Sequence, residues 1–330
     1  MIRKLVDAFY TKIFINILVE KVATVVYIEV CSQDSIVENI QMRFETNSIN
    51  SKMYEFIKTY IKSSPYYYIS ILDKSLNQGA VPTCSADEMS RYIDINFSKS
   101  VCVSNLWAAY TSEDEINLIE REYKSIGLDF IFSPFVVLSK FFKDKIENNF
   151  AMFLLIEDSN ISLTIFDNSK LLYAKYIKIN LGDDNEDILI DSSLDDDDLL
   201  LDEDDIDLDN IDSEDLDDFG DIEDLDSSED IDEFAEALDM KEIVHESYEA
   251  EEDGFNEDYK RFSLIHDCVN SFYKDNTYNS DFIENIFIAD AAGVSKDLKK
   301  YLEEEMFLSV VIRKIDLCVE VCEMAKMELQ

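Results

Sequence analysis

Carboxylates are the most abundant reactive groups in this chain, and one stretch spaces them much as a calcium-binding loop does. The sequence that begins at Asp215, DLDDFGDIEDLD, puts acids at positions 1 and 3 of such a loop and Gly220 at position 6. Phe219 at position 5 has no ligand oxygen, and Asp226 stands at position 12, where a bidentate Glu is usual. We therefore predict no calcium loop, and at most loose condensation of calcium or magnesium on these acids.

Thiols and imidazoles are few, and their spacing predicts neither a catalytic centre nor a metal centre. Cys318 and Cys322 lie four residues apart on a predicted helix. They could supply half a metal site, but a reduced thiol pair in a cytosolic protein is the favoured interpretation. His245 and His266 have no Ser or Cys partner at a useful spacing, so we expect no nucleophilic catalysis from them. The six cysteines as a set show no disulfide framework: Cys31, Cys84, Cys102, Cys268, Cys318 and Cys322.

Nearly all of the unusual charge sits in one segment. The chain of 330 residues has 73 Asp and Glu against 29 Lys and Arg, a formal net charge of −44. Residues 183–258 hold 38 acids and one lysine, which leaves 35 acids and 28 bases in the remaining 254 residues. That remainder is long enough for one large domain or two lobes with a core. Since no basic stripe is present, we expect no direct binding of nucleic acid.

The acidic segment also carries regularly spaced apolar residues. Its dense like charge opposes compaction, so we expect a disordered insertion. Within it, Ser228 could cap a helix that has Ile231, Phe234 and Leu238 on one face. Such a pattern is typical of segments that dock apolar anchors on a basic partner surface. Three interpretations stay open: a solvated insertion without a partner, a partner-docking segment with these three anchors, and cation binding.

The first part of the chain predicts a lobe of mixed strands and helices. Alternating apolar residues predict strands near 12–19, 23–31 and 36–45, followed by a helix over 49–62 and a buried strand over 66–72. Three strands, a helix and a strand are the first half of a ribonuclease-H-like lobe. We see no signal peptide or membrane span in the apolar run within the first two strands, because charged residues split it into halves too short to cross a membrane.

We predict that the first lobe extends over 1–148 and that a small subdomain over about 75–148 is inserted in it. Ser112 and Glu115 have the spacing of a capping box at the start of a helix, and Gly127 suits the residue after its end.

The strand and helix order then repeats. Three strands over 150–180 are followed, beyond the acidic segment, by a helix, a strand, a helix that begins after Ser295, a short strand and a terminal helix. The repeat is complete only if the acidic segment is removed. We therefore predict a second lobe made of 149–182 and 259–330, with residues 183–258 as an insertion.

Three stretches resemble the actin-like ATPase superfamily, and in detail the families of the type IV pilus protein PilM and the cytoplasmic domain of the type II secretion L protein, GspL. The resemblance implies an α/β fold of two ribonuclease-H-like lobes in an actin-like arrangement, with a long disordered acidic insertion in lobe two. The stretches are EDEINLIEREYKSIGLDFIFSPFVVLSKFF, NFAMFLLIEDSNISLTIFDNSKLLYAKYIKI, and the block from SLIHDCVNSFYKD to LSVVIRKID.

The resemblance also indicates where a nucleotide would lie, and there the sequence departs from the superfamily. Phosphate-binding turns of that superfamily typically read Asp-x-Gly, whereas the matching turns here, LVEKVA and IEDSNIS, contain no Gly. Glu157 and Asp158 of the second turn, and Asp290 and Gly293 of the adenosine-side turn ADAAGVS, are the weak candidates for residual nucleotide contact. A structural turn is the alternative interpretation for each of them.

By resemblance we expect a non-catalytic cytoplasmic scaffold, peripheral at the inner membrane, in a type IV pilus, type II secretion or DNA-uptake-like machine. Its partner would be the cytoplasmic segment of an inner-membrane assembly protein, with a motor ATPase as a further partner. No cofactor or metal is expected. Two alternatives stay open: an ATP- and magnesium-binding actin-like switch, and an acidic protein-binding or chaperone-like module that acts through residues 183–258.

Overall fold

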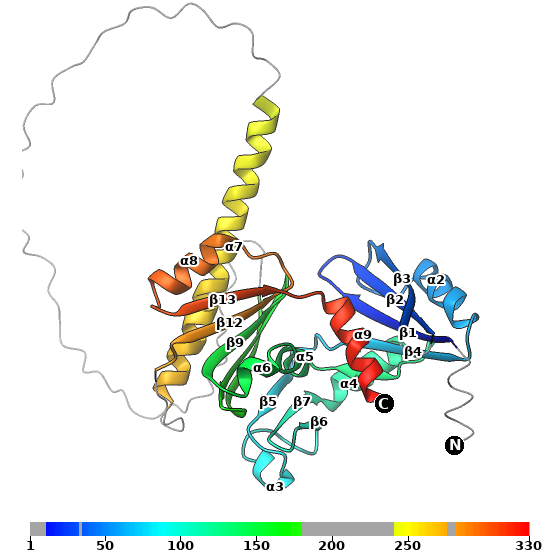
Figure 1. Ribbon diagram of the computed structural model, residues 1–330, viewed down its shortest axis with the longest axis horizontal. Helices are drawn as coiled ribbons and strands as arrows, with labels where there is room; N and C mark the ends of the chain where they lie inside the picture. Colours follow the sequence, from blue (N-terminus) through cyan, green and yellow to red (C-terminus); the bar gives the residue numbers. More distant parts are fainter. Residues whose placement is uncertain (1–10, 33–34, 180–240, 276–281, 330) are drawn as a thin grey trace, which may run out of the picture. The chain divides into compact units, whose positions relative to one another are not determined.

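A computed structural model describes residues 11–32, 35–179, 241–275 and 282–329, with side chains of the long helix described from residue 257 onward. These residues form two five-stranded sheets and a small three-stranded sheet, with helices packed around them (Figure 1). The predicted α/β class and the two-lobed arrangement are confirmed. The segment 180–240, and with it Ile231, Phe234 and Leu238, lies outside the described residues.

Lobe one is built on a sheet with the strand order β3-β2-β1-β4-β8. β1 pairs antiparallel with β2 and parallel with β4, so the sheet has the mixed order of a ribonuclease-H-like lobe. Asn50 caps the helix that follows β3, where its side chain accepts a hydrogen bond from the N–H of Met53 at 2.9 Å. The elements are β1 (Thr11–Val19), β2 (Thr24–Ser32), β3 (Ser35–Phe44), α2 (Ser51–Ile61), β4 (Tyr66–Leu72) and β8 (Phe130–Phe132).

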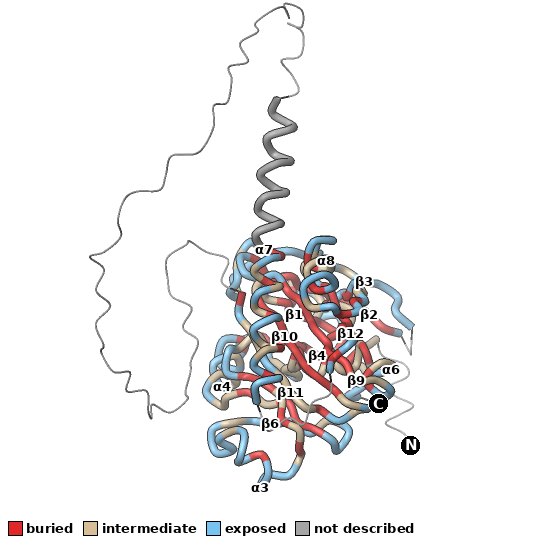
Figure 2. Tube along the Cα trace, turned by 90° about the vertical axis from the view of Figure 1, so that its left-hand side faces the viewer, coloured by how far each residue is buried: buried red, intermediate tan, exposed pale blue. Residues whose placement is uncertain are grey.

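Lobe two repeats the same strand order as β11-β10-β9-β12-β13. Its central strands are buried on both faces, and Figure 2 shows that β10 is buried almost throughout. Two sheets of the same order in one chain give the actin-like architecture that the sequence predicts. The elements are β9 (Phe150–Ile156), β10 (Asn160–Asp167), β11 (Lys170–Lys178), α7 (Lys241–Lys274), β12 (Asn285–Asp290), α8 (Lys296–Glu304) and β13 (Ser309–Lys314).

A small sheet of order β5-β7-β6 lies between β4 and β8 in the sequence. A disulfide joins Cys84 to Cys102 in this region, a bond that the cysteine spacing does not predict. The capping box is not formed, because Ser112 makes no side-chain cap and Glu115 accepts hydrogen bonds from Asn77 instead. The elements are β5 (Gln78–Val81), α3 (Ala86–Met89), β6 (Ser98–Val103), β7 (Trp107–Ser112) and α4 (Glu113–Glu122).

The last helix of each sequence repeat packs on the other lobe. Helix α5 (Pro134–Phe141) follows β8 of lobe one and contacts β9 and β10 of lobe two. Helix α9 (Leu317–Glu328) follows β13 of lobe two and contacts β1, β2 and β4 of lobe one (Figure 1). The short helix α6 (Lys143–Ile146) completes the link after α5. One hydrophobic core therefore includes strands of both sheets and both exchanged helices.

Polar contacts fix α9 on lobe one. The Nζ atom of Lys326 lies 2.6 Å from the fully buried carboxylate of Glu29, and the side-chain amide of Asn16 donates to the carbonyl of Cys318 at 3.4 Å. Burial lowers the pKa of Lys326, but its hydrogen bonds to Glu29 and Glu323 outweigh that effect and raise the pKa to about 12. Lys326 is thus charged at neutral pH and neutralises Glu29.

The predicted insertion is too long at its C-terminal end. Helix α7 begins at Lys241, and within the predicted insertion Asp258 is 1% exposed. The carboxylate of Asp258 accepts from Arg261 at 2.8 Å and from the N–H of Ser295 at 2.9 Å. Asp258 therefore holds the start of α8 in place. The charge count that defines the acidic segment does not distinguish this buried residue from the acids before it.

We expect Leu138→Ala to destabilise the protein by about 2–5 kcal/mol, since it leaves a cavity where α5 enters the shared core. Urea unfolding followed by circular dichroism measures this change. The matched control is Leu118→Ala on α4, where the side chain is 57% exposed and the loss should stay below about 1 kcal/mol. Equal losses for the two variants would contradict the shared-core description.

Candidate functional site

A cavity of about 260 Å³ lies between the two lobes, at the turns that follow the central strands. Lobe one contributes the β1–β2 turn and the residue after β4, and lobe two contributes the β9–β10 turn. The start of α9 closes the cavity. The residues that line it are Leu18, Glu20, Val25, Gln41, Lys74, Glu157, Asp158, Ser159, Ala291, Ile315, Asp316, Leu317 and Cys318.

Glu157 and Lys74 form an ion pair between the lobes inside this cavity. The Nζ atom of Lys74 lies 2.7 Å from Oε1 of Glu157, and the two side chains are 19% and 4% exposed. Each follows a central strand, β4 in lobe one and β9 in lobe two. A buried charge is strongly destabilised without a partner, so this pair joins the lobes and neutralises both groups.

One backbone N–H group at each of these three turns is bonded within the chain. The N–H of Glu20 donates to the carbonyl of Ala23 at 2.8 Å, and that of Glu157 donates to Asn160 at 2.9 Å. The N–H of Ala291 donates to Ile156 at 2.9 Å. These donors are therefore not available to cradle an anion in the way that phosphate-binding turns do.

Asp290 and Gly293 form a structural turn. Oδ1 of Asp290 accepts from the N–H of Gly293 at 2.7 Å and from that of Val294 at 3.0 Å. Gly293 has a φ of 78°, a left-handed conformation that glycine adopts without strain. Of the four candidate residues, the structure thus brings Glu157 and Asp158 into the cavity and gives Asp290 a backbone-capping role.

Sequence reasoning missed three charged residues of this cavity: Glu20, Lys74 and Asp316. Glu20 lies in the turn LVEKVA, which has no glycine, and it forms an ion pair with Arg43. Asp316 caps α9 by accepting from the N–H of Cys318 at 3.0 Å. Only Lys74 lacks a signal in the sequence, because its partner Glu157 is far away along the chain.

A second hollow, a groove of about 340 Å³, runs between the open edge of lobe one and the small sheet. Strand β8 forms one wall, where Phe130 and Phe132 stack with ring centroids 5.7 Å apart. Val101 of β6 also lines the groove and is 65% exposed. Since β8 is last in its sheet, no described strand pairs with its outer edge. We call this hollow the β8 groove.

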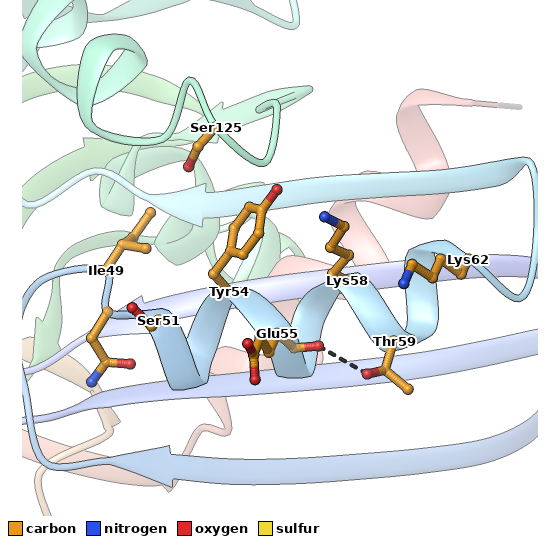
Figure 3. A pocket seen from close by; sticks show the side chains of 9 residues that line it. Ile49, Ser51, Tyr54, Glu55, Lys58, Thr59, Lys62 and Ser125 are labelled. Atoms are coloured by element: carbon orange, nitrogen blue, oxygen red, sulfur yellow. Dashed lines mark hydrogen bonds between the residues drawn. The ribbon is translucent and has the colours of Figure 1, made fainter.

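A third, shallower hollow of about 740 Å³ lies over helix α2 (Figure 3). Tyr54, Lys58 and Lys62 follow one another along the helix, and Ser125 faces them from the loop after α4. The Nζ atom of Lys58 lies 5.1 Å from the ring centre of Tyr54. Glu55 lines this hollow together with Lys58 and Lys62. Because the lining carries both signs of charge, the hollow indicates no particular class of ligand.

Burial disfavours the reactive thiolate form of Cys318 and Cys322. Cys318 and Cys322 are both free thiols, and burial raises the pKa of Cys318 to about 12 and that of Cys322 well above its usual range. Within the described part of the chain, no three His, Cys, Asp or Glu side chains are grouped closely enough to hold a metal ion.

Two protein families match parts of this chain. Residues 152–330 match a family described as a domain of unknown function, DUF8341. The chain belongs to the DUF8341 family. Residues 9–139 match a second domain of unknown function, DUF8569. No curated protein sequence matches the chain.

Solved structures with a similar chain trace have low sequence identity. The PilM–PilN type IV pilus biogenesis complex aligns at 13% identity with a TM-score of 0.48, covering 93% of this chain and 89% of that one. A Bacteroides thetaiotaomicron protein with an actin-like ATPase fold and unknown function aligns at 10% identity with a TM-score of 0.44, covering 95% and 94%. The ethanolamine utilization protein EutJ of Carboxydothermus hydrogenoformans aligns at 6% and 0.40, covering 94% and 87%. Likenesses at this level do not extend to function.

Among the described helices, none is long and apolar enough to cross a membrane.

We expect Lys74→Met to destabilise the protein by about 3 kcal/mol at neutral pH, because it leaves the buried carboxylate of Glu157 without its counter-charge. Differential scanning calorimetry measures the loss. The control is Lys299→Met on α8, whose pair with Glu303 is 45% and 42% exposed and should contribute less than about 1 kcal/mol. A second change, Glu157→Met, should recover most of the stability, and no recovery would contradict this role of the pair.

Proposed function

We propose that this chain is a non-catalytic cytoplasmic scaffold that binds the cytoplasmic segment of a membrane protein in a type IV pilus, type II secretion or DNA-uptake-like machine. It is held at the inner membrane by that partner and transmits the movement of a separate motor ATPase. The kind of machine comes from the resemblance in the sequence. The binding role is supported by one observation, the open apolar β8 groove.

The β8 groove suits a short extended segment of a partner. The free edge of β8 offers backbone groups that a strand can pair with, and apolar side chains on both walls can hold alternate side chains of that strand. Lys99, Asp129 and Glu328 provide charges among the lining residues. The buried hydrogen bond from Thr111 to Asp73, at 2.7 Å, ties the small sheet to the end of β4. A groove between two tied elements is preformed, which lowers the entropic cost of binding.

The residues of the interlobe cavity do not fit a nucleoside triphosphate. Four carboxylates line it against one ammonium group, and that ammonium group is already paired with Glu157. One backbone donor of each turn is used within the chain. Its volume of about 260 Å³ is also below the roughly 300–1,000 Å³ usual for such ligands. These observations favour the scaffold function over the function of an ATP-binding switch.

A photo-crosslinking amino acid in place of Val101 should capture a membrane protein through its cytoplasmic segment in living cells, because Val101 lines the β8 groove. Mass spectrometry of the cross-linked product identifies the segment. The matched control is the same amino acid in place of Val22, which is also 65% exposed but does not line the groove. Capture of the same protein at both positions, or of no membrane protein at Val101, would count against the proposal.

We expect calorimetric titration of the full chain with ATP and magnesium to give no micromolar binding, since the cavity is small and its carboxylates outnumber its one ammonium group. The measurement uses nucleotide at concentrations up to the millimolar range. Saturable binding that is lost in Asp158→Asn would instead favour the ATP-binding switch over the scaffold.

A further inference from the structure

The interlobe cavity has a composition that favours a ligand opposite in charge to a nucleotide. Its four carboxylates come from three connections: Glu20 from the β1–β2 turn, Glu157 and Asp158 from the β9–β10 turn, and Asp316 from the start of α9. Among the residues that line the cavity, Lys74 is the one cation. Glu20 pairs with Arg43 and Glu157 with Lys74, which leaves Asp158 and Asp316 as an excess of negative charge in the lining. A concave site with an excess of one sign of charge concentrates ligands of the opposite sign.

One of these carboxylates has an unsatisfied oxygen. Oε1 of Glu157 faces Lys74, whereas Oε2 is buried and has no hydrogen-bond partner among the described residues. Glu157 is 3% exposed and lines the cavity. A buried carboxylate oxygen without a donor is energetically costly, and such atoms in folded proteins usually mark an ordered water or a ligand. The missing donor is therefore expected in the cavity itself.

Apart from Gln41 and Ser159, the uncharged part of the lining is apolar and lies among the acids. Leu18 and Val25 come from lobe one, and Ile315 and Leu317 come from the connection between β13 and α9. Apolar side chains next to carboxylates match a ligand that has both an aliphatic chain and cationic ends. A hydrated inorganic ion would gain nothing from this apolar surface.

The spread of the acids also distinguishes an organic cation from a metal ion. A metal site needs several ligand atoms around one point, and the described residues hold no such group of three acids, histidines or cysteines. Carboxylates on separate turns instead suit separate positive groups. Asp158 is exposed, and one oxygen of Asp316 caps α9, so both can accept a further hydrogen bond.

We propose that the interlobe cavity binds a small aliphatic diamine or polyamine, with one ammonium group donating to Glu157 Oε2. This site goes beyond the scaffold role, because it lies in the cavity and not in the β8 groove. A bound ligand would contact turns of both lobes and the start of α9, and so would stabilise the arrangement of the lobes described above.

The test is calorimetric titration of the full chain with 1,4-diaminobutane and with spermidine at about 0.15 M salt, where weak surface attraction is screened. We expect one saturable site for each amine. Glu157→Gln and Asp158→Asn should each weaken it by roughly tenfold or more, because each removes a charged hydrogen bond. Butylamine, which has one ammonium group, should bind at least about tenfold more weakly than 1,4-diaminobutane.

The matched control is Glu304→Gln, which removes the same charge from an exposed position on α8 outside the cavity. It should leave the affinity unchanged, which separates the cavity from general attraction to the acidic residues 183–258. Asp158→Asn changes an exposed side chain, so it keeps the test valid if Glu157→Gln impairs folding. Equal amine binding by all variants would overturn the proposal, and so would displacement of the amine by ATP with magnesium at the same site.

Discussion

The exchange of the last helix between the two lobes is the constraint on which the rest of this molecule depends. Each five-stranded sheet leaves an apolar face that needs cover, and α5 and α9 cover the sheet of the opposite lobe. A separated lobe would therefore expose the face that the other lobe's helix covers. The exchange also fixes the buried pair of Glu29 and Lys326, because neither charge is tolerated in a core alone.

The position of the cavity follows from this exchange. Both sheets present the ends of their central strands to the same space, and α9 begins at its edge with Leu317 and Cys318 in the lining. The pair of Lys74 and Glu157 lies where β4 and β9 end, so a change in the angle between the lobes must first alter this pair. The cavity is thus coupled to the lobe interface by an ion pair as well as by its position.

The sequence predicts the fold better than the site, for a physical reason. Strand alternation and turn residues are local, so the order of strands and helices in both lobes is correct, and Asn50 and Ser295 cap helices near the predicted starts. Contacts between distant residues leave no local signal. Glu115 bonds to Asn77 in place of the expected capping box, and Asp258 is buried although it ends an acidic run. The anchors Ile231, Phe234 and Leu238 stay a prediction.

The turns of lobe two show how a fold can keep its geometry while its chemistry changes. Asp290 and Gly293 still shape the turn after β12, and they do so with backbone hydrogen bonds that need no ligand. At the β9–β10 turn the hairpin closes from Glu157 to Asn160, although two acids stand where a phosphate-binding turn would have glycine. Backbone pairing and core packing maintain both turns, so the side chains that face the cavity are free to vary. A change of ligand charge in this cavity therefore requires few substitutions and no change of fold.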